Sequence, residues 1–293
     1  MADVRDGLAW ARNTLPGLLR RRRPDVRIDG GRVVAVGWST GGHLALSLGW
    51  TAAAAGVAPP DAVLAFYCPS DYEDACWARP NLPFGAPAAP PEDYDLDEGL
   101  ADRPLVAYNP PPAARAAGGW MSPADARSRI VLHMNWRGKT VPVLVHGLKK
   151  RRPAARSEEE EAEGEVALGG NRDAGGETGG GDGRRRRDDA PPPPPPAPTA
   201  AQVRAISPLA QIRVGTYRTP TFLVHPEDDD LIPWQQARAT AEALARRGVE
   251  AELRIVRGAG HLFDLYARYD GHGEAAAAVA DGYRFLARHA GLG

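Results

Sequence analysis

Apolar side chains near the start of the chain recur at the spacing of an amphipathic helix. Val4, Leu8, Ala11 and Leu15 lie three or four positions apart and would form one stripe along a helix. Pro16 follows directly, and a proline inside a helix removes a backbone hydrogen bond and clashes with the preceding turn. We therefore expect a helix that is ended or kinked at Pro16.

Short apolar runs alternate with helical segments in two stretches of the chain, up to residue 67 and again from about residue 202. Such runs are typical of strands that are buried on both faces of a parallel sheet. The expected strands are 33–36, 62–67, 221–224 and 251–256, and the expected helices are 42–52, 234–247 and 274–289. The alternation predicts an α/β fold with a parallel sheet of about four strands flanked by helices.

A polar segment of biased composition separates the two stretches, at 150–201. It has no aromatic residue from 156 to 190, and it contains an acidic run at 158–161, a basic run at 184–187 and six consecutive prolines at 191–196. Such a segment cannot bury enough apolar surface to offset the entropy lost when it becomes ordered. We expect a disordered linker that is partly polyproline.

These patterns divide the chain into four parts. They are the first part of the core, a lid insertion, the linker and the second part of the core, at 1–67, 68–149, 150–201 and 202–293. The insertion holds Trp120, Met121 and Trp136, which together with Trp38 are candidates for a pocket around a hydrophobic substrate. An equally supported alternative is that the aromatic residues of the insertion form a small core of their own.

Charge and composition exclude several classes of protein. Lysine and arginine total 36 of the 293 residues and aspartate and glutamate total 37, so the net charge of -1 gives no general attraction to nucleic acid or to an anionic membrane. The two cysteines, Cys68 and Cys76, are too few for a disulfide scaffold and lack the spacing of a zinc site. No run of about eighteen apolar residues is present, and the first residues carry acids where a signal peptide has bases. We expect an intracellular, cytoplasmic protein.

The sequence Gly37-Trp38-Ser39-Thr40-Gly41 lies between an expected strand and an expected helix. In this G-x-S-x-G arrangement the serine takes a strained backbone conformation on a tight turn, which small neighbours such as Gly37 and Gly41 permit. The amide of Thr40, near the N-terminus of the helix, would face the oxyanion that develops during acyl transfer. The pattern makes Ser39 a candidate nucleophile.

A serine nucleophile needs a histidine base that is oriented by a carboxylate. An acidic loop at 225–233 follows one expected strand, and His261 lies in a glycine loop after the last expected strand. Successive aspartates are also typical of a solvated turn, and a loop histidine is often structural. The order Ser39, Asp229, His261, with each residue at the end of a strand, is that of α/β-hydrolases.

Three segments, 33–50, 205–233 and 258–263, resemble the α/β-hydrolase domains of fungal polyketide biosynthesis. These comprise thioesterase-like releasing domains and free-standing esterase relatives, which are akin to the hormone-sensitive-lipase and prolyl-oligopeptidase branches. The resemblance implies that Ser39 attacks the substrate and that His261 takes and returns the proton. It also implies chemistry without a metal or an organic cofactor.

The resemblance also places the acid that orients the histidine. In this family it lies in a His-Gly-x-x-Asp-x-x-Val-Pro-like loop, and aligning the ends of that pattern with His225 and Pro233 puts the acid at Asp229. The loop here has proline in place of the family's glycine after the histidine. The neighbouring acids Asp228 and Asp230 therefore remain alternatives.

One family feature has no counterpart in the sequence. A His-Gly-Gly-Gly loop whose amides complete the oxyanion hole lies roughly seventy residues before the family's nucleophile. Only 38 residues precede Ser39, and none of them supplies such a loop. The resemblance thus implies that the first four strands of the family sheet are absent from this sequence. Strand 33–36 would then be an exposed apolar edge that favours self-association.

Three hypotheses on function follow. The leading one is a serine hydrolase that acts on an ester or thioester, with a polyketide or other hydrophobic acyl group as its small-molecule substrate, either free or bound to a carrier protein. The alternative is a catalytically impaired hydrolase fragment or half-protein that binds a partner. The third is a prolyl-oligopeptidase-like peptidase, because that branch shares the order of the triad.

Overall fold

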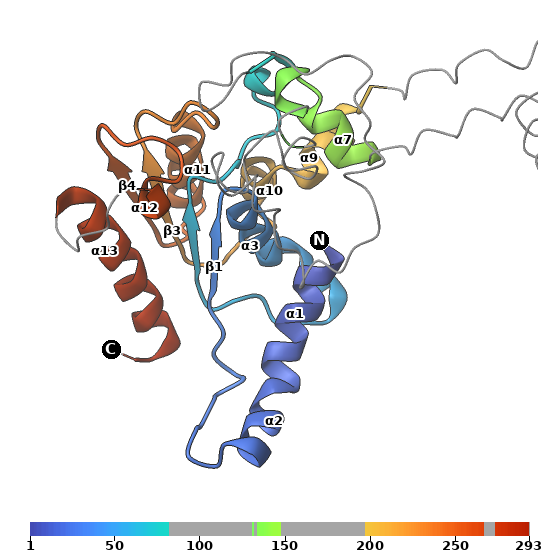
Figure 1. Ribbon diagram of the computed structural model, residues 1–293. Coiled ribbons are helices and arrows are strands. Elements are labelled where there is room, and N and C mark those ends of the chain that lie inside the picture. Colours follow the sequence, from blue (N-terminus) through green and yellow to red (C-terminus); the bar gives the residue numbers. More distant parts are fainter. Residues whose placement is uncertain (82–130, 132–133, 148–196, 267–272, 293) are drawn as a thin grey trace, which may run out of the picture. The chain divides into compact units, whose positions relative to one another are not determined.

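The computed structural model describes residues 1–81, 131, 134–147, 197–266 and 273–292 (Figure 1). Contacts divide the chain into two units, and the one described here comprises Met1–Pro91, Val131–Val145 and Pro198–Gly293. It therefore joins segments from both sides of the predicted linker. The predicted boundaries of the lid and the linker stay predictions, because most of both lies outside the described residues.

Within the described residues, four parallel strands form one sheet in the order β1-β2-β3-β4. They are β1 (Ala35–Trp38), β2 (Val63–Phe66), β3 (Thr221–Pro226) and β4 (Ala251–Val256). The strand β3 pairs with β2, which precedes the predicted linker, and with β4 on its other side. Both central strands are buried along their whole length. The predicted parallel sheet of about four strands is confirmed.

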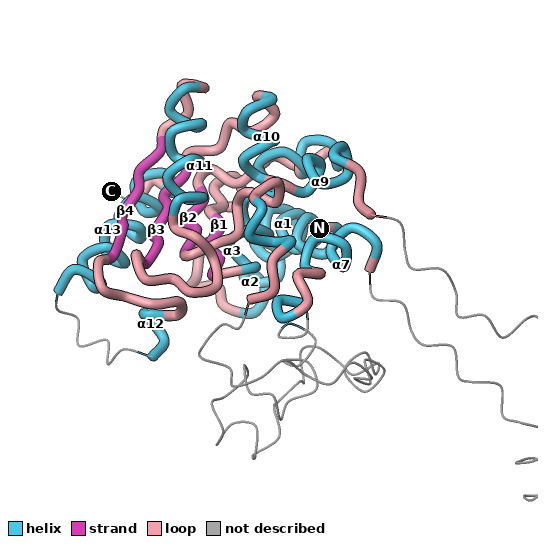
Figure 2. The backbone as a smooth tube through the Cα atoms, turned by 90° about the horizontal axis from the view of Figure 1, so that it is seen from above, coloured by secondary structure: helices cyan, strands magenta, loops and turns pink. Residues whose placement is uncertain are grey.

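Helices cover both faces of the sheet (Figures 1 and 2). They are α3 (Thr40–Thr51), α10 (Pro208–Val214) and α11 (Gln235–Arg246) on one face and α13 (Gly273–Ala290) on the other. Alternate side chains of a strand point to opposite faces. Accordingly, Val63 and Ala65 pack with the first group of helices, whereas Leu64 and Phe66 pack with Phe285 of α13. Burial on both faces explains why these strands have continuous apolar sequences.

Two helices begin the chain where the sequence predicts one. The helix α1 (Ala2–Asn13) is followed at once by α2 (Leu15–Arg22), and Pro16 lies in the first turn of the second helix. Proline is well tolerated there because the first N–H groups of a helix have no intrahelical acceptor. Pro16 therefore begins a helix instead of only ending one. Arg12 ties α1 to the sheet through an ion pair with Asp61 and hydrogen bonds to loop carbonyl groups.

The strand β1 lies two residues further along than the predicted strand 33–36. Val33 is held instead by a mutual contact with Asp61, which accepts from the Val33 amide through its side chain and donates its own amide to the Val33 carbonyl. As expected, β1 lies at one edge of the sheet. Self-association through this edge stays a prediction.

The remaining described elements are short. They are η1 (Ala53–Ala55), η2 (Ala75–Ala78), α7 (Thr140–His146), α9 (Ala200–Ile206) and α12 (Phe263–Tyr266). The helix α9 begins with a capping box in which Thr199 and Gln202 bond each other's backbone amides. The helix α9 thus begins two residues before residue 202, where the sequence predicts that the alternation resumes. None of the described helices has the length and apolar composition needed to cross a membrane.

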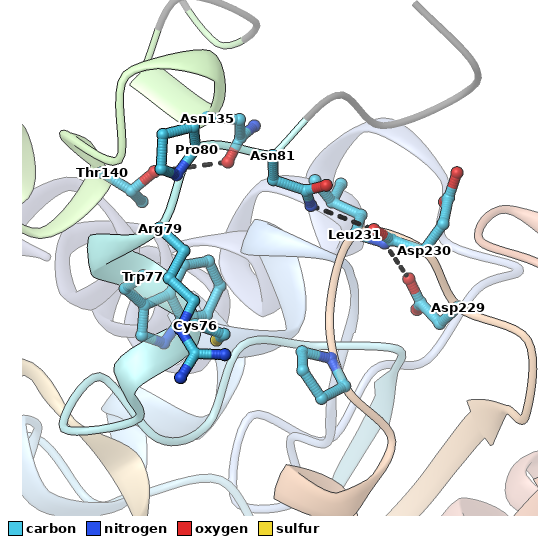
Figure 3. A pocket seen from close by; sticks show the side chains of 11 residues that line it. Cys76, Trp77, Arg79, Pro80, Asn81, Asn135, Thr140, Asp229, Asp230 and Leu231 are labelled. Atoms are coloured by element: carbon cyan, nitrogen blue, oxygen red, sulfur yellow. Dashed lines mark hydrogen bonds between the residues drawn. The ribbon is translucent and has the colours of Figure 1, made fainter.

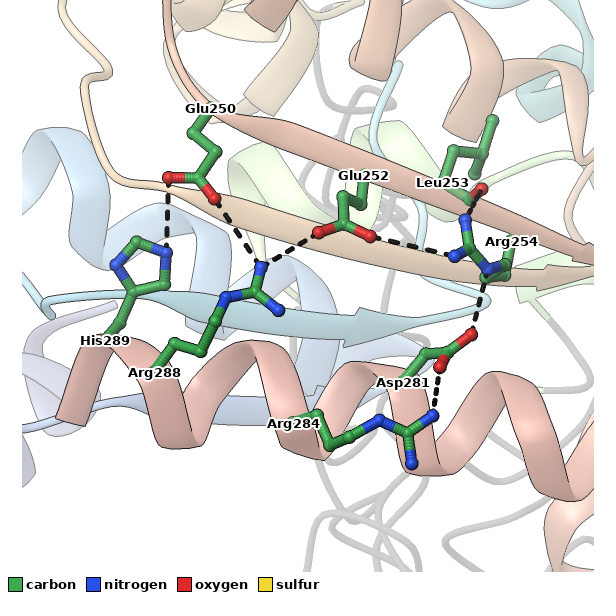
Figure 4. Close-up of polar contacts among 8 residues, drawn as sticks. All are labelled: Glu250, Glu252, Leu253, Arg254, Asp281, Arg284, Arg288 and His289. Atoms are coloured by element: carbon green, nitrogen blue, oxygen red, sulfur yellow. Dashed lines mark hydrogen bonds and ion pairs between the residues drawn. The ribbon is translucent and has the colours of Figure 1, made fainter. Parts of the chain in front are cut away.

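Charged side chains join the outer strand β4 to α13 (Figure 4). Each pair is partly exposed, and such pairs contribute only about 0–1 kcal/mol each. The cluster is formed by Glu250, Glu252, Arg254, Asp281, Arg284, Arg288 and His289.

Candidate active site

The turn between β1 and α3 holds Ser39 in a conformation that side chains rarely adopt, with φ 50° and ψ −125°. The chain can turn this sharply because Gly37 has no side chain, since an added Cβ would lie 2.1 Å from the carbonyl oxygen of Gly41. The expectation that Gly41 must also be small is wrong, because a Cβ there would meet nothing within 4 Å. Gly42 is the second crowded position, 2.5 Å from the Cβ of Cys68.

The side chain of His261 lies next to this serine. Its Nε2 atom is 3.2 Å from Ser39 Oγ, and its Nδ1 atom is 2.8 Å from Asp229 Oδ2. His261 is 8% exposed, which leaves only a small part of the ring accessible. The structure thus brings three of the predicted residues into one hydrogen-bonded line, although they lie up to 222 positions apart in the sequence.

Asp229 is the member of the acidic loop that reaches His261. Its Oδ1 atom accepts hydrogen bonds from the amides of Leu231 and Ile232, both at 2.9 Å. Its neighbours Asp228 and Asp230 are exposed, whereas the Asp229 side chain is fully buried. The two alternatives that the sequence left open therefore do not occupy this position.

A second histidine also contacts this carboxylate. His225 Nε2 lies 3.1 Å from Asp229 Oδ2 and 2.9 Å from the carbonyl oxygen of Ile232. Burial alone would raise the pKa of Asp229, but hydrogen bonds from His225 and His261 lower it to about 2. Asp229 is therefore ionised at neutral pH. Sequence analysis used His225 only to align the loop and missed this contact.

Thr40 is the first residue of α3, directly after Ser39. The first N–H groups of an α-helix have no intrahelical acceptor and carry the positive end of the helix dipole. The Thr40 amide is therefore a donor of the kind that an oxyanion requires.

The predicted pocket residues fall into different parts of the structure. Trp38 is 38% exposed and stacks on Phe66, with ring centroids 5.4 Å apart and an interplanar angle of 5°. Trp136 is 5% exposed, and its part in a substrate pocket stays a prediction. Trp120 and Met121 lie outside the described residues.

A cavity of about 240 Å³ lies beside the acidic loop (Figure 3). On one side it is bordered by the loop itself, including Asp229 and Leu231, and Asn81 donates a hydrogen bond to the carbonyl of Asp230 across its rim. The other lining residues come from the segment around η2, from Asn135 and from the first residue of α7, and are Cys76, Trp77, Arg79, Pro80, Asn135 and Thr140, with Pro233 completing the wall. The lining is mixed polar and apolar. Sequence analysis did not identify this cavity.

No group of three or more His, Cys, Asp or Glu side chains gathers in the described ranges in a way that could hold a metal ion. Both cysteines are free thiols, and burial raises the pKa of each to about 12. Neither is therefore a thiolate at neutral pH.

Residues 194–293 match the prolyl oligopeptidase family. This range contains the acidic loop and His261, and it supplies two of the four strands of the parallel sheet. In the described residues the fold is a parallel α/β sheet with helices on both faces. The strand-turn-helix around Ser39 lies at one edge of this four-stranded sheet.

Over its whole length the chain is similar to segments of fungal non-reducing polyketide synthases. It is 49% identical over 290 residues to the synthase adrD of Penicillium rubens, which covers 99% of this chain and 10% of that protein. It is 47% identical over 293 residues to mapC of Penicillium brevicompactum, which covers 100% of this chain and 11% of that protein. The chain spans about a tenth of the length of the curated relatives that it matches.

Solved esterases also align with the chain. An esterase of Thermogutta terrifontis is 17% identical with a TM-score of 0.41, and the alignment covers 97% of this chain and 64% of that chain. Carboxyl esterase 2 of Tuber melanosporum is 14% identical with a TM-score of 0.39, covering 93% of this chain and 59% of that chain.

Proposed function

We propose that the protein is a serine hydrolase that acts on an ester or thioester through Ser39, His261 and Asp229. The observation that carries the proposal is the hydrogen-bonded line from Ser39 Oγ to His261 Nε2, at 3.2 Å, and from His261 Nδ1 to Asp229 Oδ2, at 2.8 Å. Nucleophile, base and orienting carboxylate follow one another in the order, and at the distances, that this chemistry requires.

In the first half of the reaction, Ser39 Oγ bonds to the carbonyl carbon while its proton passes to His261 Nε2. The oxyanion that forms on the carbonyl oxygen faces the amide of Thr40. His261 then gives the proton to the leaving alcohol or thiol as the bond to the acyl group breaks. Asp229, which is ionised, keeps the Nδ1 proton of His261 in place and stabilises the imidazolium.

In the second half, water takes the place of the alcohol or thiol. His261 removes a proton from the water, whose oxygen attacks the acyl-enzyme carbonyl, and the same proton returns to Ser39 Oγ as the acid is released. No step requires an electron donor or acceptor.

We infer that the substrate carries a hydrophobic acyl group of the polyketide type, delivered as a thioester on a carrier protein. Support comes from the 49% identity to a non-reducing polyketide synthase. It also comes from Trp38, the residue before Ser39, whose partly exposed indole offers an apolar surface at this edge of the sheet.

The test is the hydrolysis of an aryl ester and of an aromatic acyl thioester by the purified chain and its variants. We expect Ser39→Ala and His261→Gln each to lower turnover by at least about a thousandfold while the protein still unfolds cooperatively. Ser47→Ala is the matched control, because Ser47 lies in α3, the helix that directly follows Ser39, and its hydroxyl donates to the carbonyl of Leu44. Turnover by Ser39→Ala at the wild-type rate would overturn the proposal.

A peptidase is the second candidate, supported by the match of residues 194–293 to the prolyl oligopeptidase family. Both functions use the same acylation chemistry and differ in the leaving group, an amine in place of an alcohol or thiol. The discriminating assay offers a proline-containing peptide anilide and the acyl thioester at equal concentration. Ser39-dependent cleavage of the anilide alone would favour the peptidase.

A further inference from the structure

One carboxylate bridges two aromatic side chains that flank the proposed catalytic pair. Asp264 Oδ2 accepts a hydrogen bond from the indole Nε1 of Trp38 at 2.7 Å, and its Oδ1 accepts one from the hydroxyl of Tyr67 at 2.6 Å. Both oxygens are thus engaged by donors at the ends of neighbouring strands, since Trp38 is the last residue of β1 and Tyr67 directly follows β2. Hydrogen bonds to an ionised carboxylate are about twice as strong as those between neutral groups.

Each of the two donors is directly linked to a residue of the proposed triad. Trp38 is the last residue of β1 and is joined by one peptide bond to Ser39. The Tyr67 ring meets the His261 ring edge-on, with centroids 4.7 Å apart and an interplanar angle of 63°. Asp264 itself follows His261 by three residues. The bridge therefore connects the turn that holds the serine to the loop that holds the histidine.

Because Tyr67 is buried, its hydroxyl needs a hydrogen-bond acceptor within the protein, and Asp264 supplies it. The Tyr67 side chain is 0% exposed, and its backbone has φ 35°, a conformation that side chains rarely adopt. A buried hydroxyl without a partner is costly, so the position of the ring depends on an acceptor at this place. Burial, and then the hydrogen bond to Asp264, raise the pKa of Tyr67 well above its usual value, so the hydroxyl stays a donor.

The same carboxylate also orients the indole ring of Trp38. Its indole stacks on Phe66, a contact that covers one face of the ring. The hydrogen bond from Nε1 to Asp264 adds a directional contact at the edge of the ring. The geometry of Ser39 and the exposed face of the indole then depend on one carboxylate.

We propose that Asp264 is a positioning residue that holds Trp38 and Tyr67 so that Ser39 and His261 stay within hydrogen-bond distance. The inference rests on the proposed function. Asp264 does not touch the reacting atoms, so it acts on the rate of acylation through the two aromatic side chains. Small displacements of a nucleophile and its base cost large factors in rate, up to about a hundredfold for 1 Å.

The test compares Asp264→Asn with Tyr67→Phe and with the double variant. The asparagine amide keeps the shape but offers one acceptor in place of two, and Tyr67→Phe removes one hydroxyl while leaving the ring beside His261. We expect kcat for an activated ester to fall about tenfold in Asp264→Asn and about threefold in Tyr67→Phe, with KM within about twofold of wild type. In the double variant we expect about the same loss as in Asp264→Asn alone, because both changes break one bridge.

Asp281→Asn is the matched control, since it removes a carboxylate of α13 that pairs with Arg254 of β4 and Arg284 of α13 and has no part in the proposed site. We expect its kcat to equal that of the wild type. Should Asp264→Asn fail to fold, Tyr67→Phe alone still decides, because it leaves the carboxylate in place.

Two results would overturn the inference on different grounds. Wild-type kcat in Asp264→Asn and Tyr67→Phe, in a protein whose turnover is abolished by Ser39→Ala, would refute the positioning role and leave the proposed function intact. Turnover that does not depend on Ser39 would refute the proposed function, and the role of Asp264 with it.

Discussion

The imidazole Nε2 of His225 lies 3.1 Å from Oδ2 of Asp229, and the two side chains are 1% and 0% exposed. The same nitrogen lies 2.9 Å from the carbonyl oxygen of Ile232, so His225 donates its Nε2 proton between these two acceptors. A buried carboxylate is costly unless donors surround it. His225 therefore helps to keep Asp229 ionised and in place for His261.

Replacing His225 tests this support. We expect His225→Phe to lower the free energy of unfolding by about 1–3 kcal/mol relative to His225→Gln, because the glutamine amide can still donate to the carboxylate and the phenyl ring cannot. Urea unfolding of both variants at pH 7 measures the difference. Equal stability of the two variants would contradict a donor role for His225.

Two glycines of the serine turn differ sharply in the space around them. An added Cβ at Gly37 would lie 2.1 Å from the carbonyl oxygen of Gly41, whereas one at Gly41 would meet nothing within 4 Å. We expect Gly37→Ala to destabilise the fold by about 1–3 kcal/mol or more, and Gly41→Ala to leave stability within about 1 kcal/mol of wild type. Thermal unfolding of the pair provides the comparison, and equal melting temperatures would refute the steric account.

We predict that the buried side chain of His43 lowers the free energy of unfolding in mild acid. Burial lowers its pKa to about 4 from 6.5, although the hydrogen bond between Nε2 and the Ile206 carbonyl raises it. Tyr72 faces the other ring nitrogen, with its hydroxyl 3.3 Å from Nδ1. The unfolded chain therefore takes up a proton near pH 6.5, whereas the folded chain does so only near pH 4. Stability is fully present above pH 6.5 and falls as the pH drops to 4.

The size of this effect follows from the difference in pKa. Each unit corresponds to about 1.4 kcal/mol, so about 3 kcal/mol is lost between pH 6.5 and pH 4. We expect His43→Gln to remove most of this pH dependence, because glutamine can bond to the Ile206 carbonyl without titrating. Unfolding free energies of the wild type and of His43→Gln, measured at pH 7 and pH 4.5, test this prediction. A wild-type protein and a His43→Gln variant with the same acid sensitivity would contradict it.

The sequence was informative where short-range patterns determine structure. The strand β4 has the predicted bounds 251–256, because its alternation of apolar and charged side chains and its flanking turn signals are local. The strand β1 begins two residues later than predicted because Asp61, a residue distant in sequence, holds the amide of Val33. Pro16 lies in the first turn of a second helix, because α1 already ends at Asn13. The effect of a proline depends on where the helix boundary falls, and the sequence did not show that boundary.

The same distinction applies to the site. A local motif and the order of the strands pointed to Ser39 and His261, which the structure brings within 3.2 Å. Tyr67 and Asp264 escaped notice because their bond spans 197 positions and neither belongs to a recognisable pattern. Residues that hold catalytic groups in place are found from packing, and a single sequence carries little signal for them.

The central claim is that Ser39 is a nucleophile activated by His261, and covalent labelling with a fluorophosphonate tests it most directly. Intact-protein mass spectrometry and peptide mapping identify the adduct, with Ser39→Ala and His261→Gln as companions to the wild type. We predict one adduct, on the peptide that contains Ser39, absent from Ser39→Ala and formed far more slowly in His261→Gln. Labelling at another residue, or no labelling of a folded wild-type sample, would contradict the account.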